Sequence, residues 1–264
     1  MDTPNTPKTV ADIKARLQVA DAAEFAVLQR SLLADTRKGV RAAVEVAQRR
    51  LQAEAAERDR LLSLYSYQAQ QAGGRLVVGL DEVGRGPVAG PLTVGAVVLP
   101  ENGIIAGLND SKQVAPEKRE KMAAEIKQVA LAWAIEHIDA DQIDAAGMSA
   151  CLRVAFRRAV AAIEAQGVMP AVVLLDGNPL HLDARELNVI KGDSLCASIA
   201  AASIIAKVER DNLMCQWAKT YPAYCFEQNK GYASADHIEA IKRYGLTPLH
   251  RATFCTAFTQ EALF

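Results

Sequence analysis

The sequence of 264 residues lacks a strong charge of either sign, since its formal net charge at pH 7 is −1. A protein that coats nucleic acid through bulk charge would carry a large basic excess, so only a local basic surface remains open. The five cysteines are scattered and include no C-x-x-C pair, which is typical of reduced thiols and not of a disulfide framework. No cluster of His and Cys residues favours zinc.

Long hydrophobic runs are also lacking. The longest, at residues 197–206, is interrupted by serines and is too short to cross a bilayer. The N-terminus shows no basic region followed by an apolar core, which is the pattern of a secretory signal. We therefore expect a cytoplasmic protein that does not span a membrane, and we expect it to be a monomer.

Residues 1–72 form the first expected domain, a helical N-terminal extension. Thr9 begins a capping-box pattern, and the sequence from there to Ala72 predicts helix throughout. No glycine occurs between Val40 and Gln71, and Gly73-Gly74 then ends the pattern.

The extension carries seven basic residues against four acids between Arg37 and Arg60. One interpretation is a solvated helix face, and the other is an auxiliary arm that binds a nucleic-acid duplex. We favour the solvated face, because a helix surface with mixed charge is the more common arrangement.

Residues 73–264 predict an α/β domain in which strands alternate with helices, followed by a helical C-terminal region. A mixed central β-sheet flanked by helices is therefore the expected architecture. The expected strands are 75–80, 92–99, 131–138, 171–176 and 187–190, and the expected helices are 116–130, 142–165 and 193–220.

Acidic side chains recur where these apolar strands end. Asp81 and Glu82 follow the first strand, Asp176 ends the fourth, and Asp193 lies at the junction between the last strand and a helix. Ligands of α/β sheets bind beyond the strand ends. Crowded carboxylates repel one another and are costly to bury unless a cation compensates. Oxygen ligands suit Mg²⁺ or Mn²⁺, and two such ions are the usual clamp for phosphodiester hydrolysis.

Two features of these acids leave other interpretations open. A single aspartate, such as Asp193, is equally well explained as a helix cap or a turn former. Neighbouring strand residues point to opposite faces, so Asp81 and Glu82 share a site only if the strand bends. The glycines that follow would permit such a bend.

The glycines after the acids do not predict a dinucleotide-binding loop. Gly84-Arg85-Gly86 continues to Gly90 with the spacing G-x-G-x-x-x-G, and Pro87 lies inside it. The preceding Asp-Glu pair would also repel a pyrophosphate. A glycine-rich turn does let a nucleic-acid backbone come close.

Six motifs, in order along residues 75–258, resemble those of the ribonuclease HII family. They are Asp81-Glu82-Val83-Gly84-Arg85-Gly86-Pro87, Leu108-Asn109-Asp110-Ser111-Lys112, Leu175-Asp176-Gly177, Lys191-Gly192-Asp193-Ser194 with the helix 197–211, Asn229-Lys230-Gly231-Tyr232, and Thr247-Pro248-Leu249-His250-Arg251. Arg85 favours ribonuclease HII over the related ribonuclease HIII, which typically lacks arginine in this turn. Some bacterial members also carry an N-terminal extension.

The resemblance implies a ribonuclease H-like fold and a catalytic centre in which four acids hold two divalent ions. Those acids would be Asp81, Glu82, Asp176 and Asp193. The family cleaves on the 5′ side of a ribonucleotide embedded in DNA or in an RNA–DNA hybrid, and leaves a 3′-hydroxyl and a 5′-phosphate.

Substrate contacts are implied by the same resemblance. The turn Gly84-Arg85-Gly86 matches the family turn that reads the ribose 2′-OH, the group that separates RNA from DNA. Tyr232 matches a tyrosine that stacks on the deoxyribose of the RNA–DNA junction. The expected phosphate contacts are Ser111, Lys112, Lys191 and Ser194.

The last five residues resemble the short peptide by which bacterial repair enzymes dock on the replication sliding clamp. Gln260 is followed by the apolar pair Leu263 and Phe264, which would anchor in a groove. A helix end packed on the domain is the alternative interpretation.

Two further functions compete with a junction-specific nuclease. A general hybrid-cleaving ribonuclease would share the acids but would not cut beside a single ribonucleotide. A nucleic-acid-binding protein would use the same acids only structurally, and replacing Asp81 with asparagine would then change no activity.

Overall fold

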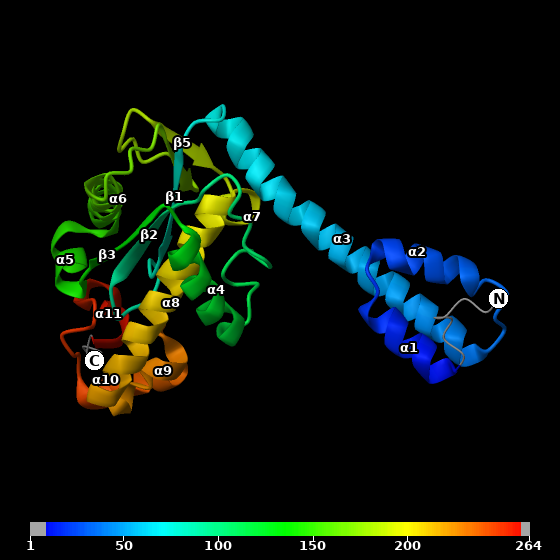
Figure 1. Ribbon diagram of the computed structural model, residues 1–264. Helices are drawn as coiled ribbons and strands as arrows, with labels where there is room; N and C mark the ends of the chain where they lie inside the picture. The colour runs from blue at the N-terminus through cyan, green and yellow to red at the C-terminus, as the bar shows by residue number, and fades with distance from the viewer. Residues whose placement is uncertain (1–8, 260–264) are drawn as a thin grey trace. The chain divides into compact units, whose positions relative to one another are not determined.

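The computed structural model describes residues 9–259 (Figure 1). The described residues up to Arg60 form one compact unit, and those from Leu61 form a second. The first unit contains α1 (Val10–Val19), α2 (Ala22–Ser31) and most of α3 (Lys38–Ala72). Its core consists of Ile13, Leu17, Ala20, Phe25, Leu28, Val40 and Ala47.

The N-terminal region is helical as expected, but not one helix throughout. The capping box of Thr9 is present, and its side chain accepts from the Asp12 N–H. Ala20 then leaves the helical region with ψ 134°, and the Asp21 carboxylate caps α2 by accepting the Glu24 N–H at 2.8 Å. An N-cap residue with an extended backbone begins a new helix. The expected continuous helix is therefore interrupted between α1 and α2.

The second unit is built on a five-stranded mixed sheet in the order β3-β2-β1-β4-β5 (Figure 1). β1 is antiparallel to β2 and parallel to β4, β2 is antiparallel to β3, and β4 is parallel to β5. The strands are β1 (Val77–Val83), β2 (Leu92–Val98), β3 (Ala132–Ile138), β4 (Val172–Asp176) and β5 (Glu186–Val189). This architecture confirms the expected α/β fold.

Helices cover both faces of the sheet, with α6 (Met148–Ala165) on one and α8 (Ala197–Thr220) on the other. Two strand glycines allow α8 to approach the backbone closely. A Cβ at Gly79 would lie 2.3 Å from the Ser198 carbonyl carbon, and one at Gly95 would lie 2.4 Å from the Ala202 oxygen. These glycines therefore bring the side chains of α8 against the acids of β1.

Two expected helices are each broken once. Residues 142–165 form α5 (Ala140–Ala146) and α6, because Gly147 adopts φ 80° between them. The helix expected from residue 193 is divided into α7 (Gly192–Leu195) and α8 by Cys196, whose backbone is extended. α4 (Pro116–Val129) begins with Pro116 at its first turn, as expected.

The C-terminal region packs several short helices against α8. They are the 3₁₀ turn η1 (Pro222–Tyr224), α9 (Phe226–Asn229), α10 (Ala235–Tyr244) and α11 (Ala252–Thr259). Their apolar side chains form one cluster around Met214 and Phe226. Within the described residues, no helix is both long and apolar enough to cross a membrane.

The end of α3 belongs to the core of the second unit. Leu61 and Leu64 are buried there, and the Gln68 side chain accepts the Ser198 N–H at 2.8 Å. The domain boundary expected at residue 72 stays a prediction. The division into compact units falls inside α3, between Arg60 and Leu61.

Candidate active site

The first two acids lie inside a strand rather than beyond its end. β1 continues to Val83, and Asp81 and Glu82 are paired with Gly95 and Val94 of β2. On the other side, the pairing of β1 with β4 stops at Leu80 and Leu175. Asp81 and Asp176 are therefore the next residues of two neighbouring strands, at the place where the sheet opens.

Asp81 is a buried carboxylate with 7 % of its surface exposed. It accepts the Glu82 N–H at 2.7 Å and is hydrogen-bonded by the Ser203 hydroxyl of α8. Burial, followed by the charges of Glu82 and Asp176, raises its pKa to about 8. A carboxylate with so little compensation favours either a proton or a cation.

The other three acids each have a separate partner. Glu82 accepts from Arg85 at 3.1 Å, Asp176 accepts the Gly192 N–H at 2.6 Å, and Asp193 lies 3.8 Å from the Lys112 ammonium. Burial raises the pKa of Glu82 despite Arg85. Burial together with Asp110 and Asp176 raises the pKa of Asp193. The site formed by these acids therefore favours the binding of a proton or a metal cation.

The donor set fits hard divalent cations, because it offers only carboxylate oxygens. Asp176 raises the pKa of both Asp81 and Glu82, so its charge acts on both neighbours of β1. Within residues 9–259, no three His, Cys, Asp or Glu side chains already converge as a metal-binding group. Each of these carboxylates instead faces a donor of its own.

The glycine turn, residues 84–91, lies directly after these acids and is held from beneath by Arg251. Its guanidinium is fully buried and donates five hydrogen bonds of 2.6 to 3.1 Å to the carbonyls of Gly84, Arg85, Pro87 and Gly90. Buried carbonyls need partners, so this one side chain determines the path of the turn.

A second buried arginine, Arg210 of α8, supports the same region. It donates to the carbonyls of Pro91, Ala89 and Lys230 at 2.9 to 3.1 Å. Burial lowers the pKa of both guanidinium groups, that of Arg251 to about 10, where it remains protonated at neutral pH. No role was predicted from the sequence for either arginine, and Arg210 lies among other charged residues, Glu209 and Asp211, so nothing local marks it as buried.

Tyr232 lies against this turn, half-exposed. Its ring atom Cε1 is 3.9 Å from the position that a Cβ would take at Gly86. The preceding carbonyl, that of Gly231, accepts the Val88 N–H at 2.9 Å. The structure thus brings together the turn and the tyrosine, which are about 145 residues apart in the chain.

The four expected phosphate contacts have different environments. Lys112 is exposed beside Asp193, and Lys191 is exposed at the start of α7, with φ 59°. Ser194 donates to the Lys191 carbonyl at 2.9 Å. Ser111 is buried, with its hydroxyl 2.9 Å from that of Ser203, so it adjoins Asp81 through Ser203.

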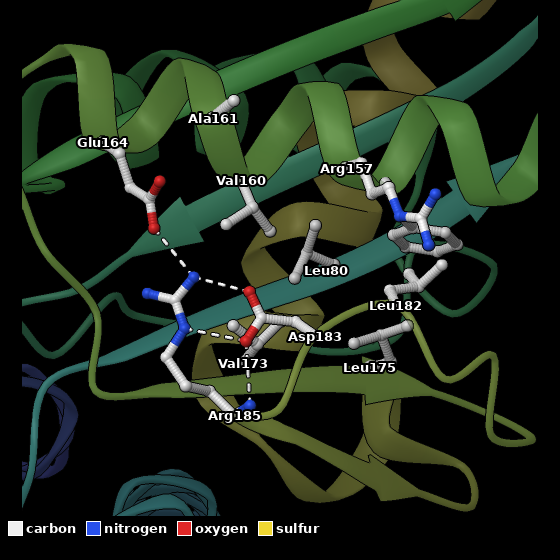
Figure 2. Close-up of a pocket in the computed structure, with 11 residues that line it drawn as sticks. Leu80, Arg157, Val160, Ala161, Glu164, Val173, Leu175, Leu182, Asp183 and Arg185 are labelled. Carbon is white, nitrogen blue, oxygen red and sulfur yellow. Dashed lines mark hydrogen bonds and ion pairs between the residues drawn. The ribbon is translucent and has the colours of Figure 1, made fainter.

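A small cavity of about 120 Å³ lies between α6 and the sheet (Figure 2). It is lined by apolar residues such as Leu80 and Val160, and by Arg185, which is ion-paired with Asp183 at 2.6 Å and Glu164 at 2.8 Å. None of the four strand-end acids lines it. Both acids that line the cavity are ion-paired with Arg185. We therefore interpret the cavity as a structural feature of the fold.

Comparison with protein-family models assigns both parts of the sequence. The Ribonuclease HII model matches residues 78–257, and the Ribonuclease HII N-terminal domain model matches residues 9–72. The chain belongs to the ribonuclease HII family. This confirms the resemblance and makes the chain a hydrolase with endoribonuclease activity.

Curated ribonucleases HII are similar over nearly the whole length. That of Bacillus subtilis is 43 % identical over 249 residues, 93 % of this chain and 96 % of the relative. That of Lactobacillus delbrueckii subsp. bulgaricus is 42 % identical over 246 residues, 93 % and 94 % of the two chains.

Solved structures of ribonucleases H2, HII and HIII share the fold. Ribonuclease H2 from Pyrococcus horikoshii is 27 % identical with a TM-score of 0.58, covering 70 % of this chain and all of that one. The ribonuclease HII of a PCNA complex from Archaeoglobus fulgidus is 24 % identical with a TM-score of 0.60, covering 71 % and 98 %. Bst-RNase HIII in complex with Mn²⁺ is 24 % identical with a TM-score of 0.57, covering 70 % and 69 %.

Proposed function

We propose that the protein cleaves the phosphodiester on the 5′ side of a ribonucleotide embedded in DNA or in an RNA–DNA hybrid, leaving 3′-hydroxyl and 5′-phosphate ends. The observation that carries this proposal is that the acids, the glycine turn and Tyr232 lie next to one another. Buried strand-end acids directly precede a glycine turn whose carbonyls are fixed by Arg251, with Tyr232 beside Gly86.

In this proposal Asp81, Glu82, Asp176 and Asp193 hold two Mg²⁺ or Mn²⁺ ions. When bound, the ions supply activation of the attacking water and neutralisation of the charge that develops on the leaving 3′ oxygen. The charges of neighbouring acids, which add to burial in raising the pKa of Asp81 and Asp193, favour cation binding. A relative with the same fold, Bst-RNase HIII, is known in complex with Mn²⁺, which supports a divalent metal in this proposal.

The chain's own residues select the substrate. With the carbonyls of Gly84 and Arg85 occupied by Arg251, the turn Gly84-Arg85-Gly86 directs its other backbone groups to the ribose 2′-OH. Tyr232 offers a half-exposed ring for the adjoining deoxyribose. Lys112, Lys191 and Ser194 contact phosphates. Ser111 is buried, and its hydroxyl lies beside that of Ser203, which is hydrogen-bonded to Asp81, so Ser111 supports this acid from within the fold.

A cleavage assay on a DNA duplex with one ribonucleotide tests the proposal. We expect one cut, on the 5′ side of the ribonucleotide, in Mg²⁺ or Mn²⁺ and none in EDTA. Cleavage of long RNA–DNA hybrids alone would indicate a general hybrid-cleaving ribonuclease. Metal-independent binding without cleavage would indicate a nucleic-acid-binding protein whose acids are structural.

We also propose that Gln260, Leu263 and Phe264 dock on a replication sliding clamp and that the protein acts as a cytoplasmic monomer. The three residues lie outside the described part of the chain. Support comes from the relative of Archaeoglobus fulgidus, whose structure is a complex with PCNA. Replacement of Leu263 and Phe264 by alanine is expected to abolish clamp binding and leave cleavage of a short duplex unchanged, and unchanged clamp binding would refute the docking.

A further inference from the structure

Two histidines that the proposed chemistry does not use lie buried beneath Tyr232. His237 belongs to α10, His250 precedes α11, and their Nε2 atoms are 3.0 Å apart. His237 is fully buried, and His250 has 5 % of its surface exposed. Because so little of either side chain is exposed, we assign neither a direct contact with the substrate.

The hydrogen bonds around the pair permit one assignment of protons. The Thr247 N–H donates to His250 Nδ1 at 2.9 Å, so that nitrogen carries no proton. His250 Nε2–H must then donate to His237 Nε2. His237 in turn has its proton on Nδ1 and donates it to the Tyr232 carbonyl at 2.7 Å. Both rings are neutral, and every step has a donor and an acceptor.

The backbone around His250 also holds the glycine turn. The Leu249 carbonyl accepts the Gly90 N–H at 2.8 Å, and the Arg251 N–H donates to the Val88 carbonyl at 2.8 Å. Ala89 and His250 form an isolated antiparallel bridge between these two bonds. His250 therefore joins the turn through its backbone and Tyr232 through its side chain.

We propose that His237 and His250 are positioning residues that set the spacing between the glycine turn and Tyr232. They thereby determine the affinity for the junction between a ribonucleotide and the following deoxyribonucleotide. This inference rests on the proposed function, since it assumes that the turn and Tyr232 contact that junction. The Tyr232 carbonyl also accepts the Ser234 N–H at 2.8 Å, so loss of the histidine bond shifts the tyrosine without leaving its carbonyl unpaired.

The test uses shape-conserving variants of the full-length protein at saturating Mg²⁺, with a duplex that contains one ribonucleotide. His237→Phe keeps a ring of similar size but removes the donor to Tyr232, and we expect its KM to rise about threefold to tenfold, the range for one hydrogen bond. Its kcat is expected to stay within about twofold. His237→Asn places an amide donor near the position of Nδ1 and is expected to restore most of the affinity.

A double-mutant cycle distinguishes positioning from general stability. Tyr232→Ala alone is expected to raise KM, and adding His237→Phe to it is expected to raise KM no further. The matched control is Tyr224→Phe, in the same apolar cluster, which removes a 2.7 Å bond to the Gly245 carbonyl. It is expected to lower Tm without changing KM.

Three outcomes would overturn the inference. Additive effects on KM in the cycle, or an unchanged KM in His237→Phe with a lowered Tm, would show a merely structural role. An unchanged KM in Tyr232→Ala would refute the tyrosine's part in the proposed function itself, and the inference with it. If His237→Phe does not fold, His250→Phe removes the donor that fixes the His237 tautomer and is measured in the same way.

Discussion

The two compact units differ in the charges that they bury. In the second unit, Arg210 and Arg251 are fully buried, and within residues 9–259 neither is ion-paired, since backbone carbonyls occupy their donors. In the first unit, charges lie on the surface and are paired along α3. Examples are Arg49 with Glu45 at 4.0 Å, Arg50 with Glu54 at 2.8 Å and Arg60 with Glu57 at 2.7 Å.

This difference indicates which charged residues have a role beyond keeping the surface soluble. Burying an ion costs several kcal/mol unless the surroundings compensate, whereas an exposed ion pair contributes about 0–1 kcal/mol. The buried ions of the second unit all lie at the acids or beneath the glycine turn. We therefore expect substitutions there to have large effects, and comparable substitutions in the first unit to have small ones.

The largest expected effect is the loss of cleavage in Asp81→Asn. The change removes one carboxylate of the proposed metal site while keeping the shape of the side chain. We expect activity on a duplex with one ribonucleotide to fall at least about 10³-fold, equivalent to about 4 kcal/mol of transition-state stabilisation. Because burial and two neighbouring acids disfavour the charge of Asp81, the Tm without metal is not expected to fall.

The matched control is Glu45→Gln, which removes an exposed carboxylate from α3. It is expected to leave cleavage unchanged. Wild-type activity in Asp81→Asn would contradict the assignment of the metal site and favour purely structural acids.

The next largest effect concerns stability and comes from Arg251→Met. Methionine roughly fills the space but cannot donate to the four carbonyls of the turn. Each buried carbonyl left unpaired costs about 1–3 kcal/mol, so we expect the free energy of unfolding to fall by at least about 3 kcal/mol. Urea denaturation measures this loss. Arg58→Met, at an exposed position of α3, is expected to change it by less than about 0.5 kcal/mol.

A smaller effect is expected when the pH falls, and it too belongs to the second unit, since all four histidines lie beyond residue 60. Burial, and then the neighbouring His237, lowers the pKa of His250 to about 4, and burial lowers the pKa of His237. At these two histidines the unfolded chain binds more protons between about pH 6.5 and pH 4, so the stability that they contribute above pH 6.5 is lost across that window. Asp81, whose pKa is raised to about 8, binds a proton more readily in the folded chain and acts in the opposite direction. The loss for His250 is at most about 3 kcal/mol.

Denaturation curves between pH 7 and pH 4 measure this slope. His250→Gln, which cannot titrate in that range, is expected to lose less stability than the wild type between pH 7 and pH 4. An equal slope in the variant would assign the acid sensitivity to other groups.

The sequence predicted the sheet, the helical extension and the family because apolar strands, glycine spacing and motifs are local signals. It misplaced the end of β1, which continues through Asp81 and Glu82 to Val83. Pairing with β2 decides that end, and pairing is not local. The single helices expected at 9–72 and 142–165 were wrong for a related reason, because one cap residue or a glycine with positive φ outweighs helical periodicity.

The roles of Arg210, Arg251 and the two histidines could not be read from the sequence. Each depends on a partner 5 to 167 residues away, and most of those partners are backbone carbonyls, which any residue provides. The motif that contains His250 and Arg251 indicated the family, but not what these side chains hold.

The smallest expected effect tests the first unit directly. Arg49→Gln removes an exposed charge whose partner, Glu45, is 4.0 Å away. We expect the free energy of unfolding to change by less than about 0.5 kcal/mol, and we expect KM for the duplex and its salt dependence to stay unchanged. If α3 instead served as a duplex-binding arm, each lost phosphate contact would lower the slope of log affinity against log salt by about 0.9. A reduction of the salt-dependence slope by that amount would contradict the contrast between the two units. It would show that a surface charge of the first unit contacts the substrate.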